Sequence, residues 1–107
     1  MTDRELLELA AKAAGWRIDF LSYDSDGLAN VYAPDGTHHA WNPLANDGDA
    51  FRLMLDLDID IYGDEKYRGA DAGDGYSATE SVDGNVYAAT RRAIVRAAAE
   101  IGATKEA

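Results

Sequence analysis

Clusters of turn-forming residues divide this sequence into short segments. They are DSDG at 24–27, PDG at 34–36, NDGD at 46–49 and DGN at 83–85. Asp and Asn favour turns because their side chains hydrogen-bond to nearby backbone, and Gly tolerates left-handed conformations. Only short elements fit between the first three of these clusters. The 107 residues are therefore expected to form a single domain over 1–107, with one core built from small elements.

Helical periodicity marks three of these segments. Thr2 and Glu5 have the spacing of a capping box, in which each side chain accepts a backbone N–H of the first helical turn. Gly15 and Gly102 follow the first and last periodic stretches, where glycine commonly ends a helix. The pattern predicts helices at about 3–14, 49–57 and 86–101.

Period-two alternation of apolar and polar residues predicts strands at about 16–20, 28–33, 37–41 and 58–62, with a further candidate at 76–82. Residues 63–75 are rich in Gly and Asp, and are predicted to form a loop. The expected fold class is α+β: an antiparallel sheet of four or five strands, with the N- and C-terminal helices packed on one face and a short middle helix.

Charge is the most unusual property of the composition. The formal net charge is −10, and residues 19–83 hold 15 acidic and three basic side chains, a balance of −12. Such a surface repels phosphate, so direct nucleic-acid binding is not expected. The absence of cysteine excludes disulfides and thiol chemistry. The N-terminus resembles no secretion signal and no apolar run is long enough for a membrane span. We therefore expect a cytoplasmic protein without membrane contact.

An aspartate row is the strongest candidate for a binding surface. If the alternation from 53 to 61 is a strand, then Asp56, Asp58 and Asp60 face one way, about 7 Å apart. Such regularly spaced carboxylates resemble a phosphate backbone. If the preceding helix extends through 57 instead, the row is lost, and a solvated face remains the simpler interpretation. With two acids of the following loop, the predicted partner-binding residues are Asp56, Asp58, Asp60, Asp64 and Glu65.

No residue pattern indicates catalysis. The Asp-x-Asp-x-Asp spacing at 56–60 resembles the start of a calcium loop, but Tyr67 stands where a bidentate Glu is needed. His38 and His39 are neighbours on a predicted strand, so they face opposite sides. Nucleophile, phosphate-loop and zinc-protease motifs are absent. We expect no enzyme activity, no metal and no cofactor.

Three short motifs occur in order along the chain: WNPL at 41–44, DGDA at 47–50 and YAATRRAI at 87–94. Together they resemble a family of small phage and prophage proteins of unknown function that includes the NinX-type proteins. The resemblance spans nearly the whole chain, although this sequence lacks a proline just before the last helix. It implies a phage accessory protein made inside a bacterial cell, and it brings no catalytic residues.

These observations predict a small acidic phage-type accessory protein that acts by protein binding. Its partner would be a host or phage protein with a basic surface. An inhibitor of a nucleic-acid-binding or antiviral defence protein, like an anti-CRISPR protein with a DNA-mimicking surface, fits this description. The alternative is a passive accessory or assembly module that self-associates as a homodimer, with acidity serving solubility alone.

Overall fold

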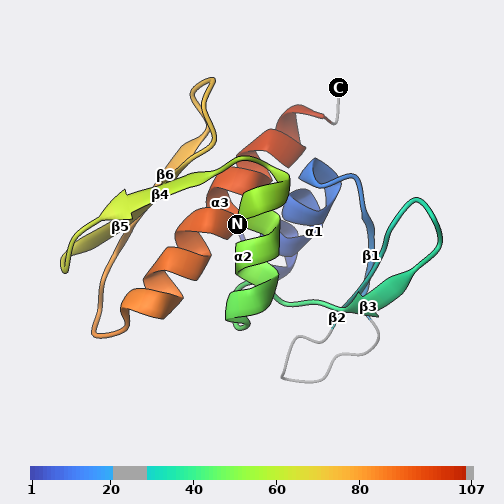
Figure 1. Ribbon diagram of the computed structural model, residues 1–107, viewed down its shortest axis with the longest axis horizontal. Helices are drawn as coiled ribbons and strands as arrows, with labels where there is room; N and C mark the ends of the chain where they lie inside the picture. Colours follow the sequence, from blue (N-terminus) through green and yellow to red (C-terminus); the bar gives the residue numbers. More distant parts are fainter. Residues whose placement is uncertain (21–28, 106–107) are drawn as a thin grey trace.

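In the computed structural model, which describes residues 1–20 and 29–105, a group of helices lies between two small antiparallel sheets (Figure 1). The order of elements is α1 (Asp3–Ala13), β1 (Arg17–Phe20), β2 (Ala29–Tyr32), β3 (His38–Ala40), α2 (Asp47–Asp56), β4 (Asp60–Gly63), β5 (Tyr67–Asp71), β6 (Ser77–Ser81) and α3 (Val86–Thr104). The predicted α+β class is confirmed. The predicted turn at 24–27 lies outside the described residues.

Local capping fixes the start of α1 as the sequence predicts. The Thr2 hydroxyl accepts the backbone N–H of Glu5, and the Glu5 carboxylate accepts the backbone N–H of Thr2, both at 3.1 Å. The Glu5 carboxylate accepts the backbone N–H of Thr2 and also its hydroxyl, and these two hydrogen bonds lower the pKa of Glu5 because they favour its charged form. Gly15 follows the helix with a φ of +81°, a conformation that glycine adopts without strain.

The strands form two sheets, so the prediction of one sheet with four or five strands is wrong. The first sheet has the order β1-β2-β3 and the second has the order β4-β5-β6. All neighbouring strands are antiparallel. The chain leaves the first sheet at Asn42 and Pro43, where proline cannot donate to a ladder. Helix α2 then separates the two sheets along the chain.

Strand β5 corrects the prediction of a loop over 63–75. It is the central strand of the second sheet, and its Gly69 and Ala70 are buried. A Cβ on Gly69 would lie only 2.3 Å from the ring of Tyr62. Ala70 is fully buried in the core beneath α3. Small residues are needed at these two positions because a ring and a helix approach them closely. The strand therefore lacks the alternation of large apolar and polar side chains by which a strand is recognised in a sequence.

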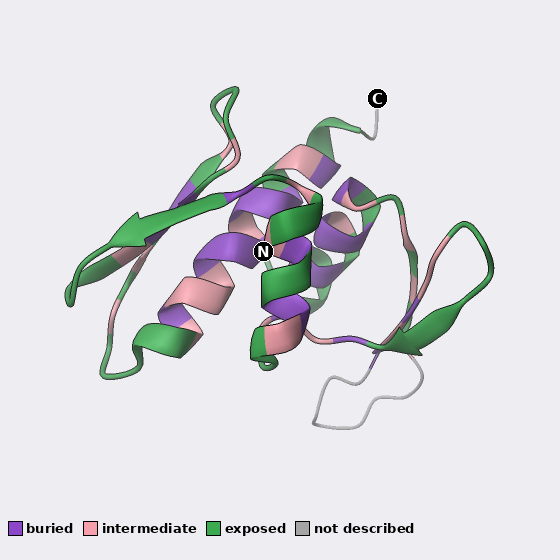
Figure 2. Ribbon diagram, viewed as in Figure 1, coloured by how far each residue is buried: buried purple, intermediate pink, exposed green. Residues whose placement is uncertain are grey.

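Helix α3 is the centre of the packing (Figure 2). It contacts β5 and β6 on one side and α1 on the other, whereas α1 packs mainly on α3 and contacts the first sheet at β1. The prediction that both terminal helices cover one sheet face is therefore wrong for α1. Buried alanines, including Ala10 of α1 and Ala98 of α3, allow the helices to lie close together. No helix within the described ranges has the length and apolar character that crossing a bilayer requires.

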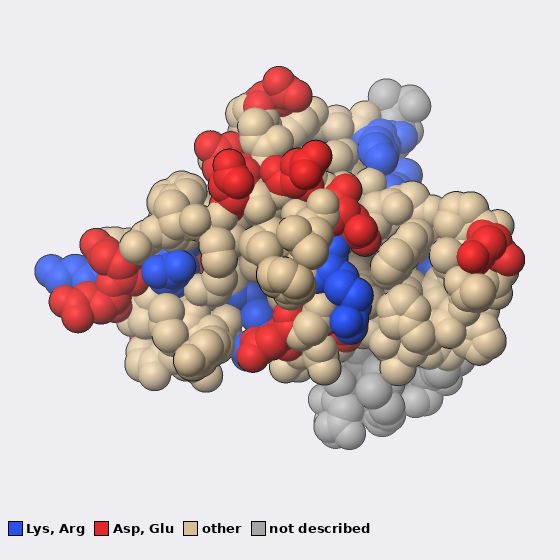
Figure 3. Space-filling view, viewed as in Figure 1, with Lys and Arg blue, Asp and Glu red and all other residues tan. Residues whose placement is uncertain are grey.

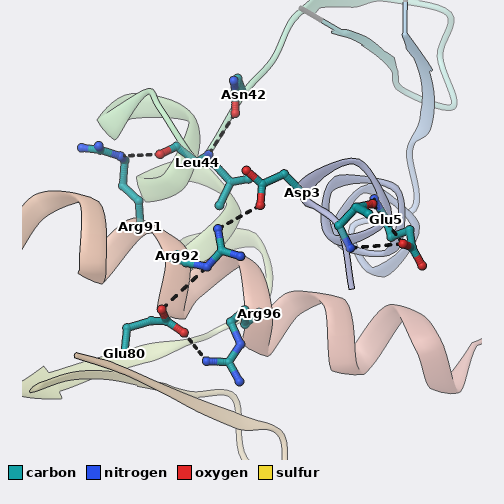
Figure 4. Close-up of polar contacts among 9 residues, drawn as sticks. Asp3, Glu5, Asn42, Leu44, Glu80, Arg91, Arg92 and Arg96 are labelled. Atoms are coloured by element: carbon teal, nitrogen blue, oxygen red, sulfur yellow. Dashed lines mark hydrogen bonds and ion pairs between the residues drawn. The ribbon is translucent and has the colours of Figure 1, made fainter. Parts of the chain in front are cut away.

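Arginines of α3 join the elements around it (Figure 4). Arg92 donates to the Asp3 carboxylate at 2.9 Å, and its Nε lies 3.7 Å from Glu80 of β6. Arg96 also pairs with Glu80. These side chains therefore act as counter-charges within the fold, and they connect the start of α1 to the second sheet.

Candidate functional site

The predicted aspartate row is not on one strand. Asp56 is the last residue of α2, Asp58 lies in a turn with a φ of +53°, and Asp60 is the first residue of β4. The turn is held by the backbone N–H of Ile59, which donates to the carbonyl of Met54 at 2.9 Å. With the left-handed conformation of Asp58 and its N–H donating to the carbonyl of Leu55 at 3.3 Å, this is a Schellman-type end of the helix, and the buried Ile59 follows it. The three carboxylates are therefore not aligned on one strand, and of the two alternatives the one in which the helix extends and the row is lost is found.

A different set of carboxylates gathers instead. Asp60 lies directly opposite Asp71 of β5 in the antiparallel ladder, and Asp74 lies in the turn that follows β5, with a φ of +54°. In Figure 3, acidic side chains lie along the upper edge of this view, over the β5–β6 turn and the end of α2. We call this group the acidic end: Asp56, Asp58, Asp60, Asp71 and Asp74, all exposed.

The other two predicted residues lie at the opposite end of β4. Asp64 and Glu65 belong to the turn between β4 and β5. The Asp64 carboxylate accepts the backbone N–H of Lys66 at 2.8 Å and that of Tyr67 at 3.1 Å. These two hydrogen bonds are the main reason that the pKa of Asp64 is lowered, and the charge of Arg68 contributes less. Asp64 thus has a structural role in its turn, apart from the acidic end.

Residues missed by the sequence analysis complete the surface. Alternation along β4 and β5 places Asp60, Tyr62, Tyr67 and Asp71 on the face of the second sheet that points away from α3. The opposite face carries Ala70, which is buried in the core. Both tyrosines are exposed. Carboxylates can pair with ammonium or guanidinium groups, and tyrosine rings attract the same cations through their faces. This outer face therefore suits a basic ligand.

Charge at the acidic end is not compensated within the part of the chain that the structure describes. Asp47, Asp49 and Glu80 each pair with an arginine. Among the described residues, the five members of the acidic end form no ion pair with a lysine or arginine. Asp71 accepts the backbone N–H of Gly73 at 2.7 Å, which fixes its side chain at the turn. The remaining lone pairs of these carboxylates face solvent.

The two histidines lie in β3, at the edge of the first sheet. His38 stacks on Tyr32 with ring centres 5.2 Å apart, and the rings of His39 and Trp16 are perpendicular, with centres 5.5 Å apart. Across residues 1–20 and 29–105, no three His, Asp or Glu side chains converge as metal ligands would. The contacts of the histidines are thus with aromatic rings.

No protein-family model, curated protein or solved structure matches this chain. The resemblance to the NinX-type phage proteins therefore stays a prediction.

Proposed function

We propose that this protein is a small acidic accessory protein that binds a basic surface of another protein through its acidic end and the adjoining outer face. The observation that carries the proposal is the direct opposition of Asp60 and Asp71 across β4 and β5. Like charges at such a position destabilise a sheet by roughly 0.2–1 kcal/mol. A lysine or arginine from a partner would remove this repulsion on binding.

The charge of the whole chain supports the same function. A formal net charge of −10 attracts a basic partner over about one Debye length, roughly 8 Å at physiological salt, so association is faster at low salt. A basic groove that normally holds nucleic acid presents the complementary charge. The proposed partner is therefore a nucleic-acid-binding protein of the bacterial host, for which antiviral defence complexes of the CRISPR type are candidates. The protein would act by occupying that groove in place of nucleic acid.

The test compares two double variants that lose the same charge. Asp60→Asn with Asp71→Asn neutralises the central pair of the acidic end without changing side-chain size. Glu8→Gln with Asp19→Asn removes two exposed acids of α1 and β1, away from the second sheet. Each protein is immobilised and exposed to bacterial lysate at low and high salt. Retained proteins are then tested for displacement by duplex DNA.

Wild type and the Glu8/Asp19 variant should retain the same basic proteins at low salt and release them to duplex DNA. The Asp60/Asp71 variant should bind them about tenfold more weakly, the effect of losing about 1.4 kcal/mol of charged contacts. Equal retention by the two variants would show that the acidic end is not the binding surface. Retained proteins that duplex DNA does not displace would show that the partner is not bound at a nucleic-acid groove.

Self-association is a second candidate, because the chain exposes large apolar side chains. Phe51 and Leu55 of α2 and Tyr87 of α3 are all exposed. Surfaces of this kind are typical of protein interfaces. Sedimentation equilibrium over a wide concentration range tests this candidate: a mass that stays at 11.5 kDa rules it out.

A further inference from the structure

A groove of about 610 Å³ lies between α2 and α3, beside the edge strand β4. Its walls are mostly apolar: Phe51 and Met54 from α2, Ile61 from β4, and Val86, Tyr87 and Ile94 from α3. Two of the lining side chains are large and largely exposed to solvent: Phe51 is 55% exposed and Tyr87 is 68% exposed. A contiguous exposed apolar surface on a highly charged protein is typical of a binding surface.

Two arginines border this groove, and their surroundings differ. The Nε of Arg91 donates to the carbonyl oxygen of Leu44 at 2.8 Å, and its Nη1 donates to Asp47 at 2.7 Å (Figure 4 shows the first contact). Arg68 of β5 also lines the groove, but its Nε is buried and has no hydrogen-bond partner among the described residues. Arg91 is thus fixed by the fold, whereas the guanidinium of Arg68 lacks an acceptor.

The missing acceptor for Arg68 is a defined chemical requirement. A buried N–H without a hydrogen bond destabilises a protein, and more so when it carries charge. The carboxylate of Asp64 is close enough for Arg68 to contribute to lowering its pKa, but it accepts backbone N–H groups of its own turn and forms no ion pair with Arg68. The Nη atoms of Arg68 also form no hydrogen bond or ion pair with a described residue, and unlike Nε they are not sealed from the surface, so a carboxylate from outside the chain would pair with them.

We propose that this groove binds an apolar segment of a partner protein that presents a carboxylate to Arg68. An amphipathic helix lying between α2 and α3 would cover Phe51 and Tyr87 and bring one acidic side chain to the guanidinium. A second copy of this chain fits less well, because it would add a further −10 of charge. This inference does not depend on the acidic end, because none of its five residues lines the groove.

The probes are two synthetic peptides of roughly 15 residues, about the shortest length at which a helix is stable in water. Both carry Leu and Phe at helical spacing on one face. One has a single Glu within that face, and its twin has Gln at the same position. Dissociation constants are measured by fluorescence anisotropy for wild type, Arg68→Gln and Arg17→Gln. Arg17 is an exposed arginine of the first sheet, so it controls for the loss of one positive charge.

Wild type and Arg17→Gln should bind the Glu peptide about tenfold more tightly than the Gln peptide. Arg68→Gln should bind both with the weaker affinity. Phe51→Ser should weaken both peptides at least tenfold, and since Phe51 is exposed, circular dichroism should show an unchanged fold. The Asp60/Asp71 double variant should bind both peptides like wild type, so this inference and the proposed function fail separately.

Three results would overturn the inference. The first is that the twin peptides bind wild type equally. The second is that the backbone amide NMR shifts changed by peptide binding fall outside α2, α3 and β4. The third is that neither peptide binds because wild type is already a dimer, which Phe51→Ser converts to a monomer. The last result would assign the groove to a second copy of the chain.

Discussion

Replacing Gly102 by alanine tests the contact that sets the distance between α1 and α3. Gly102 lies inside α3, where alanine is more favourable than glycine by about 1 kcal/mol. Helix propensity alone therefore predicts stabilisation. The tertiary structure predicts the opposite, because a Cβ at this position would lie 1.8 Å from the carbonyl oxygen of Leu9 and 2.7 Å from its carbonyl carbon.

The magnitude follows from these distances. Ordinary contacts of a Cβ begin at 3.4 Å, so the helices would have to move apart locally by about 1.5 Å, which removes a large share of the dispersion attraction between their alanines. Overpacking of this kind costs about 1–3 kcal/mol. The obstacle is backbone and cannot rotate away, so we take the upper value. About 3 kcal/mol of strain less about 1 kcal/mol of propensity leaves a loss of about 2 kcal/mol in the free energy of unfolding.

Urea unfolding followed by far-ultraviolet circular dichroism measures this loss. The midpoint should fall by about 1 M with an unchanged slope. Gly48→Ala in α2 is the matched control, because a Cβ there meets side-chain atoms and no backbone: the cap oxygen Asn46 Oδ1 at 3.2 Å and Arg52 Nη2 at 3.3 Å. Its stability should stay within about 0.5 kcal/mol of wild type. A Gly102→Ala protein as stable as wild type would refute the close packing of α1 and α3.

Three further predictions concern polar groups. In the wild type the backbone N–H of Asn42 donates to Asp49 Oδ2 at 2.9 Å. Asp49→Ala leaves this N–H without an acceptor and should lower the free energy of unfolding by about 2 kcal/mol in urea titrations. Asp49→Asn should recover part of the loss. Glu80→Gln should lower the melting temperature by weakening its pair with Arg96, at a cost of about 1 kcal/mol, and an unchanged melting temperature would argue against that contact. The pKa of Asp64 is lowered in the folded state, so its carboxylate stabilises the fold above its ordinary pKa near 3.8 and loses this effect as the pH falls below that value. The Asp64→Asn variant should therefore lose less stability than wild type between neutral pH and about pH 3.

Local chemistry accounts for the parts of the fold that could be predicted. The start of α1 depends on Thr2 and Glu5, which are three residues apart and form their hydrogen bonds within one turn. The starts of α2 and α3 likewise depend on Asn46 and Asn85, whose side chains accept N–H groups three residues later. Such interactions need no knowledge of the rest of the chain, so the sequence is sufficient for them.

The candidate sites depended on contacts that are distant in sequence. The excess of carboxylates in the centre of the chain was visible by counting, but the opposition of Asp60 and Asp71 required β5, a strand that its small residues concealed. The groove required α2, α3 and β4 to meet, and nothing near Arg68 in the sequence indicates that its Nε lacks an acceptor. These features arise only when the second sheet has formed.

Gly102 shows the difference between the two kinds of information. The sequence by itself determined the helix starts, the α+β class and the negative charge, because caps, periodicity and composition act over a few residues. It predicted that Gly102 ends the last helix, since glycine often does. In the structure α3 continues through Thr104, and Gly102 is the position where α1 comes within contact of the backbone. Only tertiary packing decided this, because the steric demand comes from Leu9, more than ninety residues earlier in the chain.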